Sequence, residues 1–230
     1  MIDLTILIPC KNDKINLNKV IKDIKSVYPD ISILVVVEKK EDFDEKELNN
    51  FKNIRCIIQS QSGYGAALIE GINTINTKFF VIHNADGSFE VNKIKEMYNL
   101  SKNYDFVFCN RYSENAGSED DTIITFIGNK FFSGMTKYLL DIKLDDVLYT
   151  HVLCNSKYTK AFNLKQIDFT FCIELPYHVF KFKHKVKSIP TFEKKRLSGK
   201  KNVNEFKDGF LILIFILKTY ILNLFKKNKQ

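Results

Sequence analysis

The sequence predicts an α/β fold in which a mostly parallel sheet is flanked by helices. Short apolar runs without polar interruption, such as 4–9 and 31–37, are typical of strands that are buried on both faces of such a sheet. Between these runs lie longer segments with apolar residues at helical spacing, such as 15–27. Strands that alternate with helices in this order indicate parallel strands joined by helical crossovers.

The first half of the chain supplies five strands and four helices. Pro9 ends the first strand, and the helix at 65–75 opens at a glycine turn. The predicted strands cover 4–9, 31–37, 54–58, 78–82 and 106–109, and the predicted helices cover 15–27, 41–50, 65–75 and 92–102. Ligands bind at the carboxyl ends of the strands in such sheets, so we examined the polar residues that follow each strand.

The pattern changes after residue 113 and ends in a strongly apolar helix. We predict, in order, an acidic loop (113–122), a helix (126–140), an aspartate-rich turn (141–147), a helix (171–183), a strand (186–192), a basic loop (194–204) and an apolar helix (206–225). Only Lys218 is charged between Gly209 and Phe225, and a basic flank follows. This amphipathic or apolar helix is slightly short for a membrane span, which favours a helix lying on an anionic membrane surface. The alternative is a helix docked on the core or on a second copy of the chain.

Composition and charge narrow the classes of protein. The chain has 230 residues, of which 45% are hydrophobic, so it suffices for one sizeable core. Its five cysteines are scattered and form no C-x-x-C pair, which argues against a zinc site or a disulfide framework. The chain enters a strand pattern at once, so we expect no signal peptide and a cytoplasmic protein. The net charge of +8 suits a membrane surface or an anionic substrate. No nucleic-acid partner is expected, because the aromatic residues lie inside apolar runs.

Two motifs follow predicted strands. Asn84, Ala85 and Asp86 follow the strand at 78–82, and their oxygen groups at spacing i, i+2 suit a hard cation such as Mg²⁺ or Mn²⁺. An Asx turn that closes the strand is the alternative interpretation. Gly63 and Gly65 precede a helix, where they favour close approach to an anion. A tight packing turn explains the same two glycines equally well.

The order of these motifs resembles the family 2 glycosyltransferases with the Rossmann-like GT-A fold. The resemblance rests on "ILIPCKND", an acidic residue after the second strand, "GYGAALIEGI", "NADGS" and "NRY", and it continues into "FCIEL" and "RLSGKKNVNEFKDGF". Within that family the chain is most similar to the dolichyl- or polyprenyl-phosphate sugar transferases. The resemblance implies a catalytic domain over residues 1–204, followed by a membrane-interface or docking helix over 205–230.

The resemblance also implies a role for each matching residue. It implies catalytic roles for Asp86, Arg111, Asp146 and Glu174, with Arg111 near phosphate. It implies a nucleotide-sugar site formed by Pro9, Asp13, Glu38, Gly63, Gly65, Asn84 and Ala85. It implies a Mg²⁺ or Mn²⁺ site formed by Asp86, Asn84 and Ser88, and an acceptor-phosphate site formed by Arg196, Lys200 and Lys201.

Several positions depart from the family's pattern. Glu38 and the three residues after it stand where D-D-G-S is usual, and Asn84 replaces the first aspartate of D-x-D. A neutral amide at Asn84 weakens metal affinity, although Asp86 and a diphosphate can still hold Mg²⁺. The arginine of the usual S/T-G-F-R segment is absent from residues 149–152.

The resemblance implies an inverting glycosyltransferase that moves a sugar from a nucleotide-sugar to polyprenyl phosphate at the cytoplasmic face of the membrane. An anionic lipid phosphate needs no general base, whereas a saccharide hydroxyl would need one, with Asp145, Asp146 and Glu174 as candidates. The alternatives are therefore a transferase that acts on a saccharide hydroxyl in surface polysaccharide synthesis, or a catalytically impaired binding subunit. A nucleotidyltransferase is a third alternative, but no glycine-rich loop follows the first strand. Pairing into a homo-oligomer is compatible with the sequence.

Overall fold

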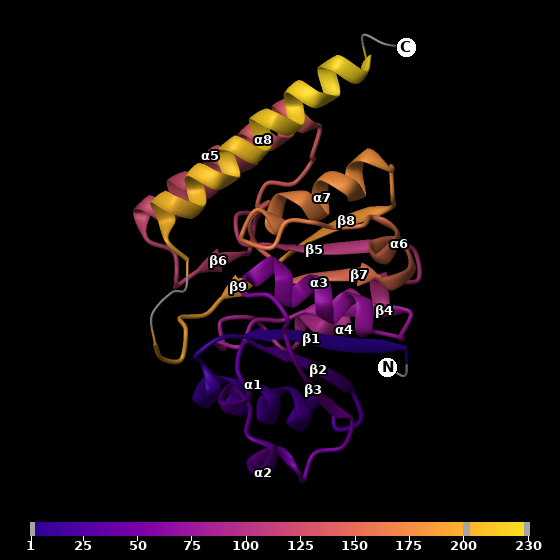
Figure 1. The fold of residues 1–230 in the computed structure, drawn as a ribbon, viewed down its shortest axis with the longest axis vertical. Helices are drawn as coiled ribbons and strands as arrows, with labels where there is room; N and C mark the ends of the chain where they lie inside the picture. The colour runs from indigo at the N-terminus through magenta and orange to yellow at the C-terminus, as the bar shows by residue number, and fades with distance from the viewer. Residues whose placement is uncertain (1–2, 200–202, 228–230) are drawn as a thin grey trace.

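A computed structural model describes residues 3–199 and 203–227, and it contains one seven-stranded sheet and one two-stranded sheet (Figure 1). The strands are β1 (Leu4–Cys10), β2 (Ser32–Val37), β3 (Ile54–Ile58), β4 (Phe79–Ile82), β5 (Phe106–Asn110), β6 (Gly117–Ser118), β7 (Val152–Asn155), β8 (Val186–Pro190) and β9 (Phe192–Glu193). The large sheet has the order β3-β2-β1-β4-β7-β5-β8. Its strands are parallel except for β7, which runs antiparallel to both of its neighbours.

Helices cover both faces of the large sheet. They are α1 (Lys14–Val27), α2 (Glu45–Leu48), α3 (Tyr64–Thr74), α4 (Lys93–Leu100), α5 (Ile123–Leu140), α6 (Ser156–Ala161), α7 (Phe171–Lys181) and α8 (Glu205–Lys227), with a 3₁₀ turn, η1 (Lys40–Asp42). Apolar residues of α1 and α4 pack on one face, and those of α3, α6 and α7 pack on the other. The result is the doubly wound arrangement that the sequence predicts, with the carboxyl ends of β1 and β4 at one edge.

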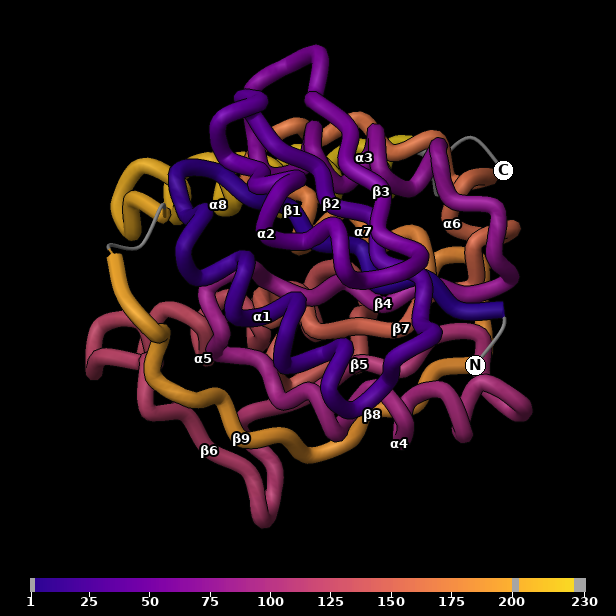
Figure 2. Tube along the Cα trace, turned by 90° about the horizontal axis from the view of Figure 1, so that it is seen from below, coloured from indigo at the N-terminus to yellow at the C-terminus, as the bar shows by residue number. Residues whose placement is uncertain are grey.

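Helices α5 and α8 form a pair that lies side by side at one end of the molecule (Figures 1 and 2). In Figure 1 the two helices run in the same direction, and both begin at the end of the pair near β6. On α8, Ile212 and Ile216 are buried, and Asn223 accepts a hydrogen bond from the Tyr177 hydroxyl at 2.8 Å. Helix α8 is also long and apolar enough over Glu205–Phe225 to cross a membrane. Only 17% of the most apolar stretch of this helix is buried in the protein. A narrow stripe therefore docks α8 on the core, while most of its surface stays exposed.

The predicted α/β fold is confirmed, and the first five strands and the later helices lie within a few residues of their predicted bounds. One prediction was wrong in part. The helix predicted at 41–50 is reduced to η1 and α2, because the backbone at Phe43 between them is extended. The sequence did not predict β7 and α6, and β7 runs antiparallel to both of its neighbours in the mostly parallel sheet. The division into domains at 204/205 stays a prediction.

Two histidines are buried side by side beneath the carboxyl end of β4. His83 and His151 are at most 1% exposed, and their ring centroids lie 5.2 Å apart. His151 stacks on Phe89 at 4.6 Å. Within the described residues, none of the four ring nitrogens has a hydrogen-bond partner. Burial lowers the pKa of His83 from 6.5 to about 3, and burial, together with His83, lowers the pKa of His151 well below 6.5. Both rings are therefore neutral in the folded protein at neutral pH.

We expect this pair to make the fold sensitive to acid. Below pH 6.5 the unfolded chain binds a proton at each histidine and the folded chain does not, so the free energy of unfolding falls as the pH falls. In His151→Phe, which cannot titrate at this position, the slope of that free energy between about pH 6 and pH 5 should be shallower by about 1.4 kcal/mol per pH unit. Urea unfolding at a series of pH values measures both slopes. Equal slopes in the two proteins would contradict the neutral, buried state of His151.

Candidate active site

One cavity of about 650 Å³ lies at the carboxyl ends of β1 and β4 and extends to α5 and α8. The topology explains this position, since neighbouring parallel strands end at the same edge of the sheet. The predicted site residues that line it are Pro9, Asp13, Gly63, Asn84, Ala85, Asp86, Arg111 and Arg196. The structure therefore brings together residues that are up to 187 positions apart in the sequence.

Asp86 is held between a serine and an arginine. Its Oδ1 accepts hydrogen bonds from the Ser88 backbone nitrogen at 3.0 Å and from the Ser88 hydroxyl at 2.8 Å. Its Oδ2 lies 3.3 Å from Nη2 of Arg196, and the same nitrogen lies 3.4 Å from Asp120 Oδ2. Ser88, predicted as a metal ligand, is buried and orients the Asp86 carboxylate in this arrangement. Arg196 forms an ion-pair bridge between Asp86 and Asp120, two acids from different loops.

Arg196 belongs to a segment that lies across the Asp86 loop, which we call the strap (residues 193–199). Two backbone hydrogen bonds join them, from Lys194 to the Ser88 carbonyl at 2.9 Å and from Leu197 to the Asp86 carbonyl at 3.0 Å. Gly87 has a φ of +80°, and a Cβ there would lie 2.5 Å from a Leu197 methyl group. Glycine at 87 thus lets the strap approach the loop closely. Two of the predicted acceptor residues, Lys200 and Lys201, lie outside the described residues.

Asn84 is oriented by a hydroxyl pair. Its Oδ1 accepts a hydrogen bond from the Tyr64 hydroxyl at 3.1 Å, and this hydroxyl lies 2.6 Å from the Thr150 hydroxyl. The Tyr64 ring stacks on Phe169 with 4.9 Å between the ring centroids. All four side chains line the cavity. Asn84 therefore presents a fixed amide next to Asp86, with aromatic rings beside it.

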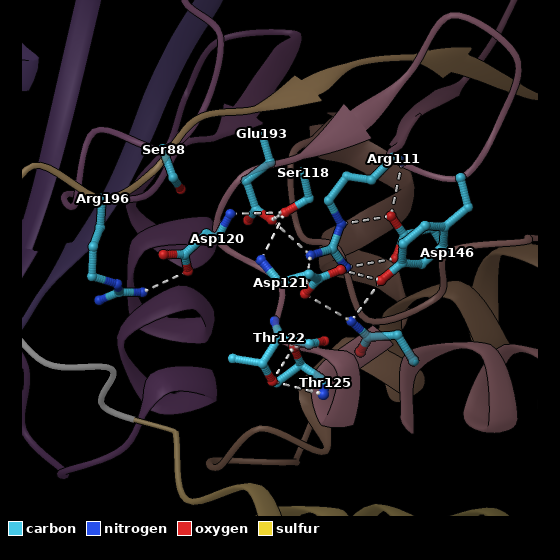
Figure 3. Close-up of polar contacts among 12 residues, drawn as sticks. Ser88, Arg111, Ser118, Asp120, Asp121, Thr122, Thr125, Asp146, Glu193 and Arg196 are labelled. Carbon is cyan, nitrogen blue, oxygen red and sulfur yellow. Dashed lines mark hydrogen bonds and ion pairs between the residues drawn. The ribbon is translucent and has the colours of Figure 1, made fainter. Parts of the chain in front are cut away.

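Arg111 is buried among three carboxylates, as Figure 3 shows. Its Nε and Nη2 both lie 2.8 Å from the carboxylate of Asp146, so the pair is bidentate. Its Nη1 lies 2.9 Å from Glu193 and 3.3 Å from Asp121. The guanidinium also lies over the Tyr149 ring, 4.5 Å from its centroid. Every guanidinium nitrogen of Arg111 is therefore engaged by protein carboxylates.

These contacts shift the titration of the buried groups in a consistent direction. Burial lowers the pKa of Arg111, but its hydrogen bonds and charge contacts with Asp146 and Glu193 raise the pKa well above the ordinary value. Burial raises the pKa of Glu193, while Arg111 and the Ser118 hydroxyl oppose that shift. Arg111 thus stays charged and compensates acids that would otherwise be buried without a partner.

The glycine turn before α3 packs against protein backbone. A Cβ on Gly65 would lie 2.0 Å from the Gln166 carbonyl oxygen, and one on Gly63 would lie 2.1 Å from the Ile167 carbonyl oxygen. The Ala66 backbone nitrogen donates to the same Ile167 carbonyl at 3.0 Å. These contacts favour the packing interpretation of the turn over an open anion site at the start of α3.

Three of the predicted acids lie outside the cavity lining: Glu38, Glu174 and Asp146, which is bound by Arg111. Glu38 binds the Ser62 hydroxyl and lies 3.1 Å from Lys11 Nζ, and these hydrogen bonds lower its pKa. Glu174 accepts backbone hydrogen bonds from Lys165 and Gln166 at 2.8 to 3.0 Å. Glu38 therefore contacts Lys11, a residue of the cavity lining, and Glu174 holds the loop before α7. Their predicted roles in the reaction stay predictions.

The cavity carries an excess of negative charge in a basic protein. Among the described residues that line it, eight are acidic and four are basic. The pKa of Asp13 is raised by burial and by the neighbouring charge of Asp86. In the described part of the chain, no three His, Cys, Asp or Glu side chains converge as a complete metal site. The residues fit a divalent cation that Asp86 holds and that oxygen atoms of a ligand complete.

Sequence reasoning missed several polar residues of the site. Asp120 and Asp121 lie in the predicted acidic loop, which in fact contains β6 and leads into α5. Glu193 lies on β9, which pairs with β6. The acidic cluster at 119–121 was a visible signal, but nothing in the sequence indicated that it would face two arginines. Nothing in the sequence indicated that Tyr64 and Thr150 would line the site.

The doubly wound sheet with a polar cleft at its carboxyl edge is a GT-A-like α/β fold. The sequence profile of glycosyl transferase family 2 matches residues 5–167. The chain therefore belongs to glycosyl transferase family 2, and the prediction that it is a glycosyltransferase is confirmed.

Solved structures agree with this fold. The chain is similar to glucosyl-3-phosphoglycerate synthase from Mycobacterium tuberculosis in complex with Mn²⁺, UDP and glucosyl-3-phosphoglycerate, with 13% identity, a TM-score of 0.70, and coverage of 94% of this chain and 79% of that one. Structures of the same synthase with Mg²⁺ and UDP (12% identity, TM-score 0.69, 94% and 78% covered) and with Mn²⁺ and UDP-glucose (11%, 0.67, 94% and 78%) are similar as well. At this identity the likeness shows the fold alone. Comparison with curated proteins finds no match.

We expect Arg111 to be required for folding stability. Arg111→Gln leaves three carboxylates without their cation, so it should lower the free energy of unfolding by roughly 3–5 kcal/mol. The loss of stability should be smaller at acid pH, because protonation neutralises the three carboxylates that have lost Arg111. Urea unfolding at two pH values measures both effects, and Arg55→Gln, at an exposed position on β3, is the control. A fully stable Arg111→Gln protein that had lost activity would instead support the predicted contact with a substrate phosphate.

Proposed function

We propose that this protein transfers a sugar from a nucleotide-sugar to a polyprenyl phosphate, with inversion at the anomeric carbon. The observation that carries the proposal is the Asp86–Arg196–Asp120 bridge in the cavity. It places an acid suited to a divalent cation directly beside an arginine suited to a phosphate. The two kinds of group that a diphosphate donor and an anionic acceptor require therefore lie within one cleft.

The arrangement of the acids favours an acceptor that is already anionic. A saccharide hydroxyl needs a general base, and the candidates were Asp145, Asp146 and Glu174. Asp146 is bound by Arg111, and Glu174 is bound by backbone nitrogens. Asp145 is exposed and lies 3.5 Å from Lys137. None of these three acids lines the cavity, whereas Arg196 does. A lipid phosphate needs no base.

The reaction then needs few groups from the protein. A phosphate oxygen of the acceptor attacks the anomeric carbon of the sugar, and the bond from that carbon to the donor diphosphate breaks. The nucleoside diphosphate leaves with the bonding electrons, and no proton moves. Arg196 and the strap hold the acceptor phosphate, while Ser88 keeps Asp86 in place. Asp86 and Asn84 would hold Mg²⁺ or Mn²⁺, which stabilises negative charge on the leaving diphosphate when bound.

We place the reaction at the cytoplasmic face of the cell membrane. The support is α8, which exposes most of its apolar surface and is followed by lysines in the sequence. Such a helix binds the interface of an anionic membrane. The docked stripe of α8 favours a helix that lies on the surface, because a crossing helix would have to leave α5 and α7.

Nucleotide binding tests the donor half of this proposal. Titration calorimetry with UDP, GDP and CDP, each with and without Mn²⁺, should show metal-dependent binding of one nucleotide. Asp86→Asn removes the carboxylate and should weaken that binding by at least about tenfold, or about 1.4 kcal/mol. Asp23→Asn, on the exposed side of α1, is the matched control. If no nucleotide binds under any condition, the proposed function is wrong.

We expect Arg196 to compete with the metal ion for the Asp86 carboxylate and to bind the acceptor phosphate. In Arg196→Gln the cation beside Asp86 is lost, so Mn²⁺ should support nucleotide binding at a lower concentration than in wild type. Transfer to polyprenyl phosphate should fall by at least about tenfold, because the phosphate loses its charged partner. The measurements are Mn²⁺ titrations of nucleotide binding and transfer assays with radiolabelled donor, with 3-phosphoglycerate as a soluble acceptor for comparison. Arg55→Gln should match wild type. Unchanged transfer in Arg196→Gln would exclude the assigned role of Arg196.

A further inference from the structure

The cavity that contains Asp86 does not end at the polar residues, but continues between α5 and α8. On α5 its lining residues include Ile124, Gly128 and Phe132, and on α8 they include Phe206, Gly209 and Ile212. We call this part of the cavity the apolar arm. Both helices begin near β6 in Figure 1, and the lining residues of the arm belong to the N-terminal parts of the two helices.

Two glycines keep the arm open. A Cβ on Gly128 would meet no atom within 4 Å among the described residues. A Cβ on Gly209 would meet only the ring of Phe132, at 3.7 and 3.8 Å. A larger side chain at Gly128 would therefore project into the arm, whereas one at Gly209 would press on the Phe132 ring. The walls of the arm include aliphatic and aromatic side chains, which suit a hydrocarbon ligand. Polar side chains of the two helices line the same cavity, namely Thr125, Asn129, Glu205, Lys207 and Asp208.

The outer faces of the same helices indicate where such a ligand comes from. On α5 the exposed apolar residues recur at helical spacing, at Ile123, Ile127, Phe131 and Tyr138, and on α8 they recur at Phe210, Ile214, Leu217 and Ile221. Helix α5 has no acidic residue, and α8 has acids only in its first turn, at Glu205 and Asp208. Lysines are the other charged residues on both helices. An apolar surface with lysines and few acids matches an anionic lipid bilayer.

We propose that the apolar arm binds the hydrocarbon chain of the lipid-phosphate acceptor, an inference that rests on the proposed function. The phosphate lies at Arg196 and the first isoprene units lie between α5 and α8. The rest of the chain passes from the helix pair into the bilayer on which the pair lies. The continuity of the arm with the cleft is what favours the chain of this acceptor over any other apolar occupant.

The test is to fill the arm without disturbing the fold. Gly128→Leu places a branched side chain in the arm, and Gly134→Leu is its matched control. Gly134 lies on the same helix, a Cβ there also meets no atom within 4 Å among the described residues, and Gly134 does not line the cavity. Both changes replace glycine by a better helix former, so neither variant should unfold.

Two readouts are needed, one of which does not depend on activity. A polyprenyl phosphate with a diazirine in its first isoprene units should label residues within 124–132 and 203–212, and Gly128→Leu should abolish most of that labelling. For transfer to long-chain polyprenyl phosphate, Gly128→Leu should lower kcat/KM by at least about tenfold. Transfer to a phosphate with one isoprene unit, and metal-dependent nucleotide binding, should be unchanged. Gly134→Leu should match wild type in every assay.

The possible results separate the two proposals. Labelling outside α5 and α8, or equal use of the long-chain acceptor by wild type and Gly128→Leu, would overturn the apolar arm as the chain site. Labelling in the arm that Gly128→Leu blocks, but without sugar transfer by the wild-type protein, would support the arm and refute the proposed function.

Discussion

The buried guanidinium of Arg111 is the interaction on which the geometry of the cleft depends. It joins four segments: the end of β5, the loop before α5 through Asp121, the turn after α5 through Asp146, and β9 through Glu193. Glu193 begins the strap that carries Arg196 across the Asp86 loop. A single ion cluster thus positions both the start of α5 and the second arginine of the site. Removing one charge from such a cluster leaves the others desolvated and uncompensated, which is why its geometry is held as a unit.

In the proposed reaction, the excess of acids in the cleft affects the order in which the donor and the acceptor bind. Arg196 already neutralises part of the charge at Asp86 and Asp120, so a divalent cation competes with that arginine for the Asp86 carboxylate. A diphosphate that enters with its cation would release the arginine. The guanidinium then keeps Asp120 as its partner and, in the proposed reaction, also binds the acceptor phosphate. The same contact that fills the cleft in the absence of ligands would therefore favour an acceptor that follows the donor.

The sequence predicted the parts of this molecule that depend on local pattern. Continuous apolar runs identified β1 to β5, and the order of the motifs identified the cleft. The antiparallel β7 was missed because four residues carry no periodicity that distinguishes a strand from a loop. Arg111 was assigned to a substrate phosphate because a motif specifies a residue type and not its partners. Those partners lie 10, 35 and 82 positions away, so only the tertiary fold brings them together.

The acids of α8 lie in its first turn, and Lys218 lies farther along the helix. This arrangement explains how a chain with a positive net charge can have an acidic cleft. In the first turn of α8, two acids and one lysine line the cleft, namely Glu205, Asp208 and Lys207, whereas Lys218 lies ten residues beyond Asp208. That is about 15 Å at the rise of an α-helix, and salt screens exposed charges beyond about 8 Å. Lys218 can therefore attract an anionic surface without cancelling the acids in the first turn of α8. The strap and the first turns of α5 and α8 are where these two electrostatic regions meet, and Gly128 and Gly209 line the cavity beside them.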